Sequence, residues 1–282
     1  MLSGPQNKKI QIGDTDMYYV SFGHGKKPFV ILPGLGDGLK TVKGLALPLS
    51  IKYKELLDEF KIYSFSRKNQ LPEGYTTRDM ARDQAEAMRL LGIEHAHLMG
   101  ISMGGMISQY MAIDYPELVD RLVLVVTLSE PNPVMDDSIE VWLDLAEKGE
   151  FQHLMTDTAR RMYTEAFFKR NEWMLPVTGV VGEPKSYDRY LVMAKACRVH
   201  NAYEELDKIK APTLVIGGEL DATLGGDPSR RIAEKIPSAE LYMYEAYGHG
   251  LYEECKDFET RVKEFLLKEI PEFSCQGDLF HG

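Results

Sequence analysis

Ser102 lies between two glycines, Gly100 and Gly104, within the stretch HAHLMGISMGGMISQYMAIDYPE at residues 95–117. An apolar run precedes this serine and an amphipathic run follows it, a pattern that predicts a strand, a sharp turn and a helix. Such a turn strains its central residue, and the residues two positions away must be small so that strand and helix can pack closely. The spacing therefore points to a serine hydroxyl exposed as a nucleophile.

The pattern G-x-S-x-G is weak by itself, because it occurs by chance in roughly one chain in ten of this length. Its alternative interpretation is a glycine-rich turn that carries a solvated serine. The predicted strand before Ser102 and the predicted helix after it favour the nucleophile.

A serine nucleophile needs a base that takes its proton. Among the seven histidines, His249 follows the last predicted strand in YGHGLYEE, which places it at the same sheet edge as Ser102. His95 and His97 begin the strand that leads to Ser102, so they lie at its wrong end. The others fall in an early turn, the helical stretch or the tail: His24, His153, His200 and His281. A structural histidine at position 249 is the alternative.

The base in turn needs an orienting acid. LVIGGELDATLGG ends a buried strand and places Asp221 in the following loop, with Glu219 close by. Glu130, which follows LVLVVTLS, is the main competitor. The resulting chain order of Ser102, Asp221 and His249 is the nucleophile-acid-base order of one particular fold.

The developing oxyanion needs two hydrogen-bond donors. FVILPGLGDG ends an early strand in a glycine-rich loop, and we expect the backbone N–H groups of Leu35 and Met103 to be these donors. A simple turn with no catalytic role is the alternative for this loop.

The elements that must position these residues begin with short β-rich stretches, KIQI, DMYYVSFG and PFVILPG, which predict an antiparallel start to a sheet. Strands and helices then alternate. Runs such as LVLVV and TLVIGG are apolar throughout, as in parallel strands buried on both faces. Thr76 and Asp79 predict a capping box before one helix. A single closing helix is expected over YEECKDFETRVKEFLLKEI.

The alternation stops between Ser129 and about Asp207, where the sequence predicts helices without a strand. These helices bury apolar residues against the main body, or they form a lid over the sheet edge. As a lid they would offer Trp142, Phe167 and Trp173 for substrate binding. We expect a core of residues 1–128 and 208–282 and a helical cap of residues 129–207.

The composition excludes several function classes. Lys and Arg number 33 against 43 Asp and Glu, and the net charge of −10 disfavours nucleic acid or anionic membranes as partners. We find neither a signal peptide nor the roughly 18–20 apolar residues of a membrane span, so we expect no membrane insertion. The three scattered cysteines indicate neither disulfides nor a zinc site, and the expected setting is reduced and cytoplasmic.

With these residues assembled, the sequence resembles the α/β-hydrolase superfamily, specifically its capped esterase and lipase-like members, over residues 8–270. GISMGG resembles the nucleophile elbow, GGELDA the acid loop and YGHGLYEE the histidine loop. The resemblance implies a mostly parallel eight-stranded sheet with helices on both faces and a helical cap after strand six. It also implies an acyl-enzyme mechanism without a cofactor or metal. Many members carry His-Gly where this chain has Pro33-Gly34.

We expect a carboxylesterase-like serine hydrolase whose partner is a small-molecule ester of small or medium apolar character. A serine at the elbow argues against dehalogenase or epoxide hydrolase relatives, which use an aspartate there. The alternatives are a carbon–carbon bond hydrolase, an amidase or aminopeptidase, and a non-catalytic ligand-binding member. The sequence leaves a homodimer open.

Overall fold

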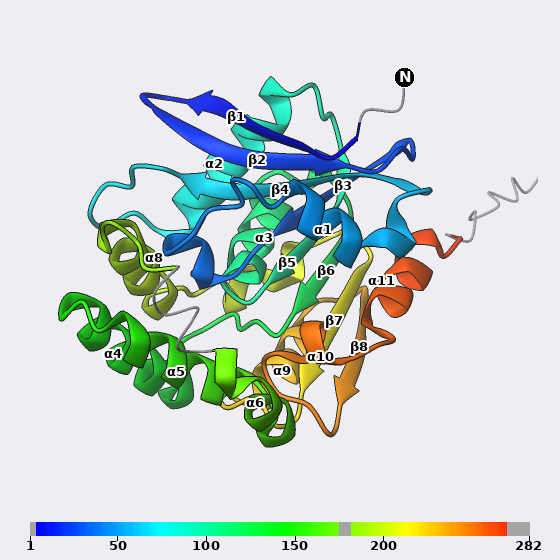
Figure 1. The fold of residues 1–282 in the computed structure, drawn as a ribbon. Helices are drawn as coiled ribbons and strands as arrows, with labels where there is room; N and C mark the ends of the chain where they lie inside the picture. The colour runs from blue at the N-terminus through cyan, green and yellow to red at the C-terminus, as the bar shows by residue number, and fades with distance from the viewer. Residues whose placement is uncertain (1–3, 175–181, 270–282) are drawn as a thin grey trace, which may run out of the picture.

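An eight-stranded sheet forms the centre of the molecule in a computed structural model, which describes residues 4–174 and 182–269 (Figure 1). The order across the sheet is β1-β2-β4-β3-β5-β6-β7-β8. The strands are β1 (Gln6–Ile12), β2 (Thr15–Phe22), β3 (Lys27–Leu32), β4 (Phe60–Lys68), β5 (Ala96–Ile101), β6 (Val119–Val125), β7 (Thr213–Gly218) and β8 (Ala239–Tyr244).

Antiparallel pairing is confined to the two neighbours of β2, at the start of the sheet. β2 pairs antiparallel with both β1 and β4, whereas every other neighbouring pair is parallel. Every residue of β5 and β7 is buried, as expected of parallel strands that are covered on both faces. The predicted mostly parallel sheet with an antiparallel start is confirmed.

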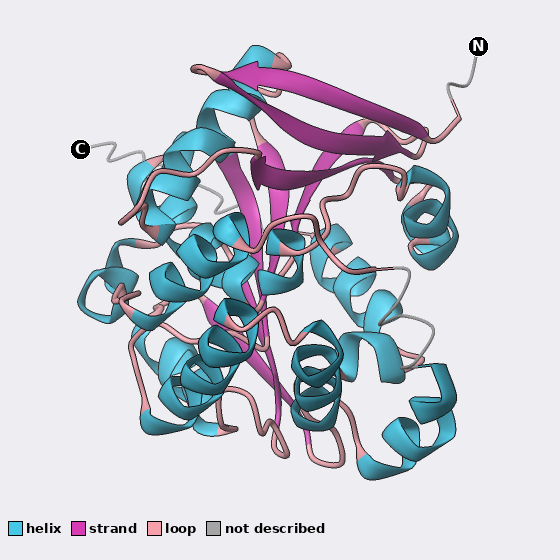
Figure 2. Cartoon of the chain, turned by 60° about the vertical axis from the view of Figure 1, so that its left-hand side comes forward, coloured by secondary structure: helices cyan, strands magenta, loops and turns pink. Residues whose placement is uncertain are grey.

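Helices cover both faces of the sheet (Figure 2). Apolar side chains of α2 (Thr77–Leu90), α3 (Met103–Asp114) and α9 (Asp227–Lys235) belong to the core on one face. Side chains of α1 (Ala46–Lys52) and α11 (Phe258–Leu267) belong to the core on the other face. The sheet is therefore buried between two apolar layers, and its strand ends remain available for a site.

The predicted capping box opens α2. The Thr76 hydroxyl accepts a hydrogen bond from the Asp79 N–H at 3.1 Å, and the Asp79 carboxylate accepts one from the Thr76 N–H at 3.0 Å. These two bonds satisfy backbone donors that have no partner inside the helix.

The prediction of a single closing helix is wrong, because the chain forms α10 (Leu251–Glu254) and then α11. Cys255 interrupts the helix with an extended backbone, φ −84° and ψ 126°. The break allows α10 to follow the loop of His249 while the apolar face of α11 still reaches the core.

A helical insert, defined here as residues 126–212, separates β6 from β7, as predicted. The described part of this insert contains no strand. Its ends meet at Ser129, whose carbonyl oxygen accepts the N–H groups of Ala202 at 2.7 Å and Tyr203 at 3.1 Å. Its helical elements are α4 (Pro133–Glu147), α5 (Phe151–Met162), α6 (Glu165–Asn171), η4 (Glu172–Met174), α8 (Asp188–Arg198) and η5 (Tyr203–Lys208).

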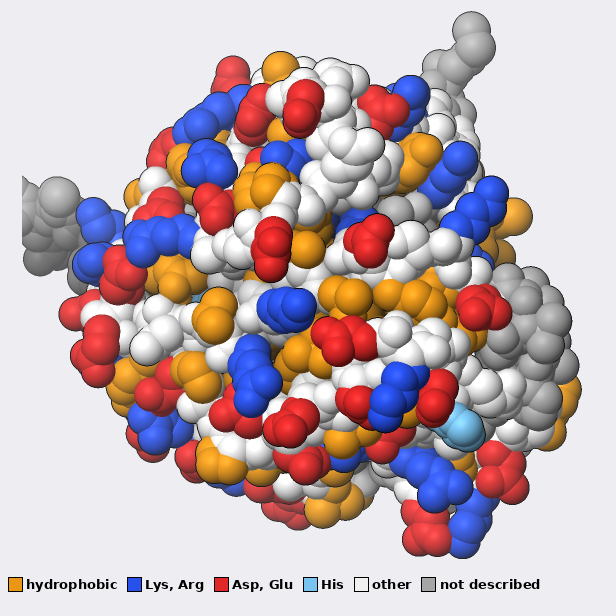
Figure 3. Space-filling view, turned by 90° about the vertical axis from the view of Figure 1, so that its left-hand side faces the viewer, with side chains coloured by type: hydrophobic (Ala, Val, Ile, Leu, Met, Phe, Trp, Pro, Cys, Tyr) orange, Lys and Arg blue, Asp and Glu red, His pale blue; other side chains and the backbone are white. Residues whose placement is uncertain are grey.

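Acidic and basic side chains are interspersed on the face shown in Figure 3, without an extended area of one sign. In the ranges that the structure describes, no helix is both long and apolar enough to cross a bilayer.

Candidate active site

Ser102 lies in the sharp turn between β5 and α3, where the sequence predicted it. Its backbone has φ 54° and ψ −120°, a left-handed conformation that is strained for any residue with a Cβ. A Cβ placed on Gly100 would lie 2.4 Å from the carbonyl oxygen of Gly104, and one on Gly104 would lie 2.0 Å from that of Leu32. Both glycines are therefore required by the close approach of the strand and the helix.

His249 joins the serine to the acid. Its Nε2 lies 2.9 Å from the Ser102 Oγ, and its Nδ1 lies 2.8 Å from the Asp221 Oδ2. The side chains of His249 and Asp221 are only 4% and 3% exposed. The loops after β5, β7 and β8 thus bring together the three side chains that the sequence singled out. In this hydrogen-bonded arrangement, a proton can pass from the Ser102 hydroxyl to the His249 imidazole.

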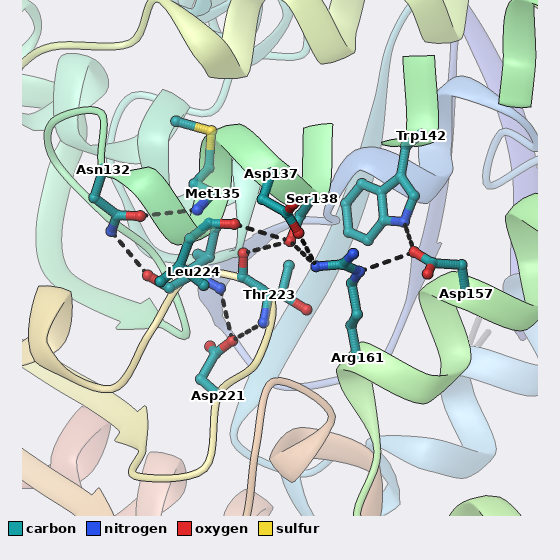
Figure 4. A network of polar contacts seen from close by, with 11 residues as sticks. Asn132, Met135, Asp137, Ser138, Trp142, Asp157, Arg161, Asp221, Thr223 and Leu224 are labelled. Atoms are coloured by element: carbon teal, nitrogen blue, oxygen red, sulfur yellow. Dashed lines mark hydrogen bonds and ion pairs between the residues drawn. The ribbon is translucent and has the colours of Figure 1, made fainter. Parts of the chain in front are cut away.

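The second carboxylate oxygen of Asp221 is held by its own loop. Oδ1 accepts the N–H groups of Thr223 at 2.8 Å and Leu224 at 2.9 Å. The carbonyl oxygens of these two residues face the helical insert, where Ser138 Oγ lies 3.0 Å from that of Thr223 and Asn132 Nδ2 lies 2.8 Å from that of Leu224 (Figure 4). The insert therefore fixes the loop that aims Asp221.

Figure 4 shows that this network continues through Arg161. Its Nη1 donates to Asp137 at 2.8 Å and to the Ser138 hydroxyl at 3.1 Å, and its Nε donates to Asp157 at 2.9 Å. The same oxygen of Asp157 accepts the indole N–H of Trp142 at 2.8 Å. Trp142 and the Asp221 loop are thereby linked through α4 and α5.

The competing acids and bases bond elsewhere. Glu130 pairs with Arg231 at 2.5 Å, and Glu219 pairs with Arg230. The remaining described histidines include four with side-chain partners away from Ser102: His24 with Asp58, His95 with Asp120, His153 with Glu150 and His200 with Thr77. His281 lies outside the described residues.

The glycine-rich loop after β3 forms a short 3-10 helix, η1 (Leu35–Gly38). A Cβ placed on Gly34 would lie 3.4 Å from the Ser102 Cβ, so this loop passes directly beside the serine. Leu35 and Met103 are each the first residue of a helical segment, where the backbone N–H has no partner inside the helix. Neither amide donates to a backbone acceptor elsewhere within residues 4–174 and 182–269, so both are available to bind an oxygen atom.

Buried charged residues that the sequence analysis missed bond the loop between β3 and η1. The Arg67 guanidinium donates to the carbonyl oxygen of Pro33, and the Arg67 N–H donates to Asp37 at 2.9 Å. Arg189 of α8 donates to the same carboxylate of Asp37. Burial lowers the pKa of Arg67 to about 10, with Asp37 opposing that shift. A buried guanidinium therefore bonds this loop at Pro33, directly before Gly34.

A cavity of about 690 Å³ opens beside Ser102 and His249, within the range typical of small-molecule sites. Of the three residues that the sequence analysis offered for substrate binding, Trp142 lines this cavity. Phe167 and Trp173 do not line it: Phe167 stacks on Tyr163, and the Trp173 side chain is 70% exposed. The insert instead contributes the apolar residues Phe151, Met155, Met162 and Tyr190.

No group of three histidine, cysteine or carboxylate side chains is placed to hold a metal ion in the part of the chain that the structure describes. At the cavity, Ser102 offers a hydroxyl and His249 an imidazole, and Asp221 supports the imidazole with its carboxylate.

Comparisons of sequence and of structure with known proteins both point to one fold family. A family model for the alpha/beta hydrolase fold matches residues 27–254. RutD of Agrobacterium fabrum, provisionally assigned as a carbamate hydrolase, is 26% identical over 242 residues, which is 83% of this chain and 92% of RutD. The 2-hydroxy-6-oxononadienedioate/2-hydroxy-6-oxononatrienedioate hydrolase of a Pseudomonas species is 27% identical over 94% of both chains.

Solved structures show the same fold. MGS-M2, an alpha/beta hydrolase enzyme from a Medee basin deep-sea metagenome library, has a TM-score of 0.81 at 22% identity, covering 95% of this chain and all of its own. A thermophilic esterase from Thermogutta terrifontis has a TM-score of 0.74 at 20% identity, covering 93% of this chain and 98% of its own.

Proposed function

Since this chain belongs to the α/β-hydrolase fold family, we propose that it is a serine hydrolase that cleaves a carboxylic ester of a small or medium apolar molecule. The observation that carries this proposal is the hydrogen-bonded line from Asp221 through His249 to Ser102, which ends at the cavity wall. A buried Asp that orients a histidine, with that histidine on a strained serine, is the arrangement that activates a hydroxyl for acyl transfer.

The first half of the reaction forms an acyl-enzyme. His249 Nε2 takes the proton of the Ser102 hydroxyl while Oγ attacks the ester carbonyl carbon. The N–H groups of Leu35 and Met103 bind the oxyanion, and Asp221 stabilises the imidazolium. The ester C–O bond then breaks, and the alcohol leaves with the proton from Nε2.

The second half repeats these steps with water. His249 takes a proton from the water as its oxygen attacks the acyl carbon, and Ser102 leaves with the proton returned by Nε2. The products are one carboxylic acid and one alcohol, and the enzyme returns to its starting state.

We assign the helical segment 129–207 as a cap over a core of residues 1–128 and 208–282. Support for a cap comes from α4 and α5, whose residues Trp142, Phe151, Met155 and Met162 form part of the cavity wall. Their apolar side chains favour a substrate with an apolar body.

A carbon–carbon bond hydrolase is the second candidate. It is favoured by the match over 94% of both chains to the Pseudomonas enzyme that is named for hydrolysis of 2-hydroxy-6-oxononadienedioate. Attack on a ketone by the same Ser102 would leave a carbon acid instead of an alcohol. An amide- or carbamate-cleaving enzyme would likewise use the same groups.

The test is the hydrolysis of p-nitrophenyl acetate, butyrate, octanoate and laurate by the wild type, Ser102→Ala and Ser238→Ala. Ser238 is exposed directly before β8, so Ser238→Ala is a matched control that should keep full activity. We expect kcat to fall by about 10⁴ or more in Ser102→Ala. Equal and substantial rates in all three proteins would contradict the assignment of Ser102. Background rates throughout would favour the carbon–carbon or amide candidates.

A further inference from the structure

The cavity beside Ser102 is mostly apolar, but four charged side chains interrupt its wall. Each of them needs a partner or solvent, because an isolated charge in an apolar surrounding is costly. The four are Asp37, Lys40, Lys52 and Glu253.

Three of these four are accounted for. Asp37 is paired with Arg189, and the carboxylate of Glu253 accepts the hydroxyl of Tyr163. Lys40 is exposed at the rim and is therefore hydrated. Lys52 differs from these three, because its ammonium group is neither fully exposed nor paired at close range with a carboxylate of the described residues.

Lys52 ends α1 on the core side of the cavity, and its side chain is only partly exposed. Its Nζ lies 5.0 Å from the ring centroid of Tyr252 and 5.6 Å from that of Tyr53. Across the described residues, no carboxylate oxygen lies within 4.0 Å of this ammonium group. Burial lowers the pKa of Lys52, while Glu253 and Glu259 act at longer range to raise it.

Two aromatic rings stabilise a cation from their faces, but they accept none of its three N–H donors as a carboxylate would. The wall of the cavity that contains Ser102 therefore carries a positive charge at Lys52 that no carboxylate among the described residues pairs at close range. An anionic group on the bound molecule would pair with that charge.

We propose that Lys52 binds a carboxylate on the substrate, so that the cavity takes esters that carry a free acid group in addition to the ester. This inference rests on the proposed function, since it assigns the substrate class of the same site. A neutral acyl chain in this position would displace solvent from the ammonium group and offer no acceptor in its place, and that cost selects against it.

The kinetic test compares two p-nitrophenyl esters of equal chain length, the hexanoate and the mono-ester of adipic acid. Lys52→Met removes the charge at nearly constant length, Lys52→Arg keeps the charge, and Lys54→Met is the control. Lys54 is exposed and does not line the cavity, yet its substitution changes the net charge equally.

For Lys52→Met we expect kcat/KM on the adipate ester to fall by about 10–100-fold, mainly through KM, which is the usual size for a lost hydrogen bond to a charged group. The hexanoate should change by less than about twofold. Lys52→Arg should recover part of the loss, and Lys54→Met should change neither ester. Equal losses on both esters, or no loss on the adipate ester, would overturn the proposal.

A binding measurement separates this proposal from that of esterase activity. Calorimetry on Ser102→Ala should show binding of monomethyl adipate at least about tenfold tighter than that of dimethyl adipate, and Lys52→Met in that background should abolish the difference. That result without any ester hydrolysis would remove the proposed function and retain the acid site. Equal binding of both compounds, or no binding of the acid, would remove the acid site even where hydrolysis is observed.

Discussion

The backbone N–H of Gly250 donates a 2.6 Å hydrogen bond to the carbonyl oxygen of Met162. Gly250 directly follows His249 in the chain, and Met162 ends α5 of the helical insert. Next to this contact, the Glu254 carboxylate accepts the Thr164 N–H at 3.0 Å and the Thr164 hydroxyl at 2.6 Å. The insert is therefore bonded to the segment that presents the imidazole.

Removal of this attachment should destabilise the protein. Glu254→Ala deletes both hydrogen bonds to Thr164, and bonds to a charged group are worth about 1.5–3 kcal/mol. We expect the free energy of unfolding in urea to fall by about that amount. Glu245→Ala, an exposed substitution in the loop between β8 and α10, is the control and should change the free energy of unfolding by less than about 0.5 kcal/mol. Equal values for the two variants would show that the attachment contributes nothing.

Asp221→Asn should inactivate the enzyme without unfolding it. The amide has nearly the shape of the carboxylate, but it neither holds the required imidazole tautomer nor stabilises the imidazolium. We expect kcat on the best p-nitrophenyl ester to fall by about 10⁴, with an unchanged circular dichroism spectrum. Glu130→Gln breaks only the contact with Arg231, so it should retain activity. If Glu130→Gln lost activity and Asp221→Asn kept it, Glu130 would be the acid that orients His249.

Arg189→Met should test the buried support of the loop that carries Leu35. The side chains of Arg189 and Asp37 are 11% and 1% exposed, so the variant leaves a buried carboxylate without its directly paired cation, although Arg67 still acts on it at longer range. Loss of one partner of such a pair costs about 3–5 kcal/mol of unfolding free energy.

Arg198→Met on the same helix is the matched control. Arg198 pairs with Asp136 at 3.5 Å, and both side chains are more than two fifths exposed (45% and 43%). Its removal should therefore cost less than about 1 kcal/mol. A loss of similar size in both variants, measured by urea unfolding, would show that the Asp37 contact is unimportant.

His200 should make the folded state sensitive to acid. It is buried against Thr77, and burial lowers its pKa to about 3. Between about pH 6.5 and pH 3 the unfolded chain therefore binds a proton that the folded chain does not. The stabilising contribution of neutral His200 to the folded state is complete above that pH window. It is lost as the pH falls through the window.

Urea unfolding of the wild type and His200→Gln at several pH values in this window is the measurement. The slope of the unfolding free energy against pH should be smaller in His200→Gln by up to about 1.4 kcal/mol per pH unit. His153→Gln changes an exposed histidine and should leave the slope unaltered. An unaltered slope in His200→Gln would mean that His200 is protonated in the folded chain.

Local signals in the sequence were sufficient for the sheet and for the placement of Ser102, Asp221 and His249. Each of these residues follows a strand that is recognisable from its apolar run, and the carboxyl ends of parallel strands meet at one edge. The break at Cys255 was not predicted, because the apolar periodicity continues across it while the backbone does not.

The residues around the site were decided only by the tertiary structure. Arg67 and Arg189 reach Asp37 from positions 30 and 152 residues away in the chain, and no periodic pattern records such contacts. Likewise, packing of the insert brought Trp142 to the cavity and left Trp173 exposed, although both read as apolar residues of helices. The sequence by itself determined which strands and turns form, because those depend on neighbouring residues. The cavity wall and the place of Lys52 depend on how distant helices pack, and that is set by the shape of the whole core.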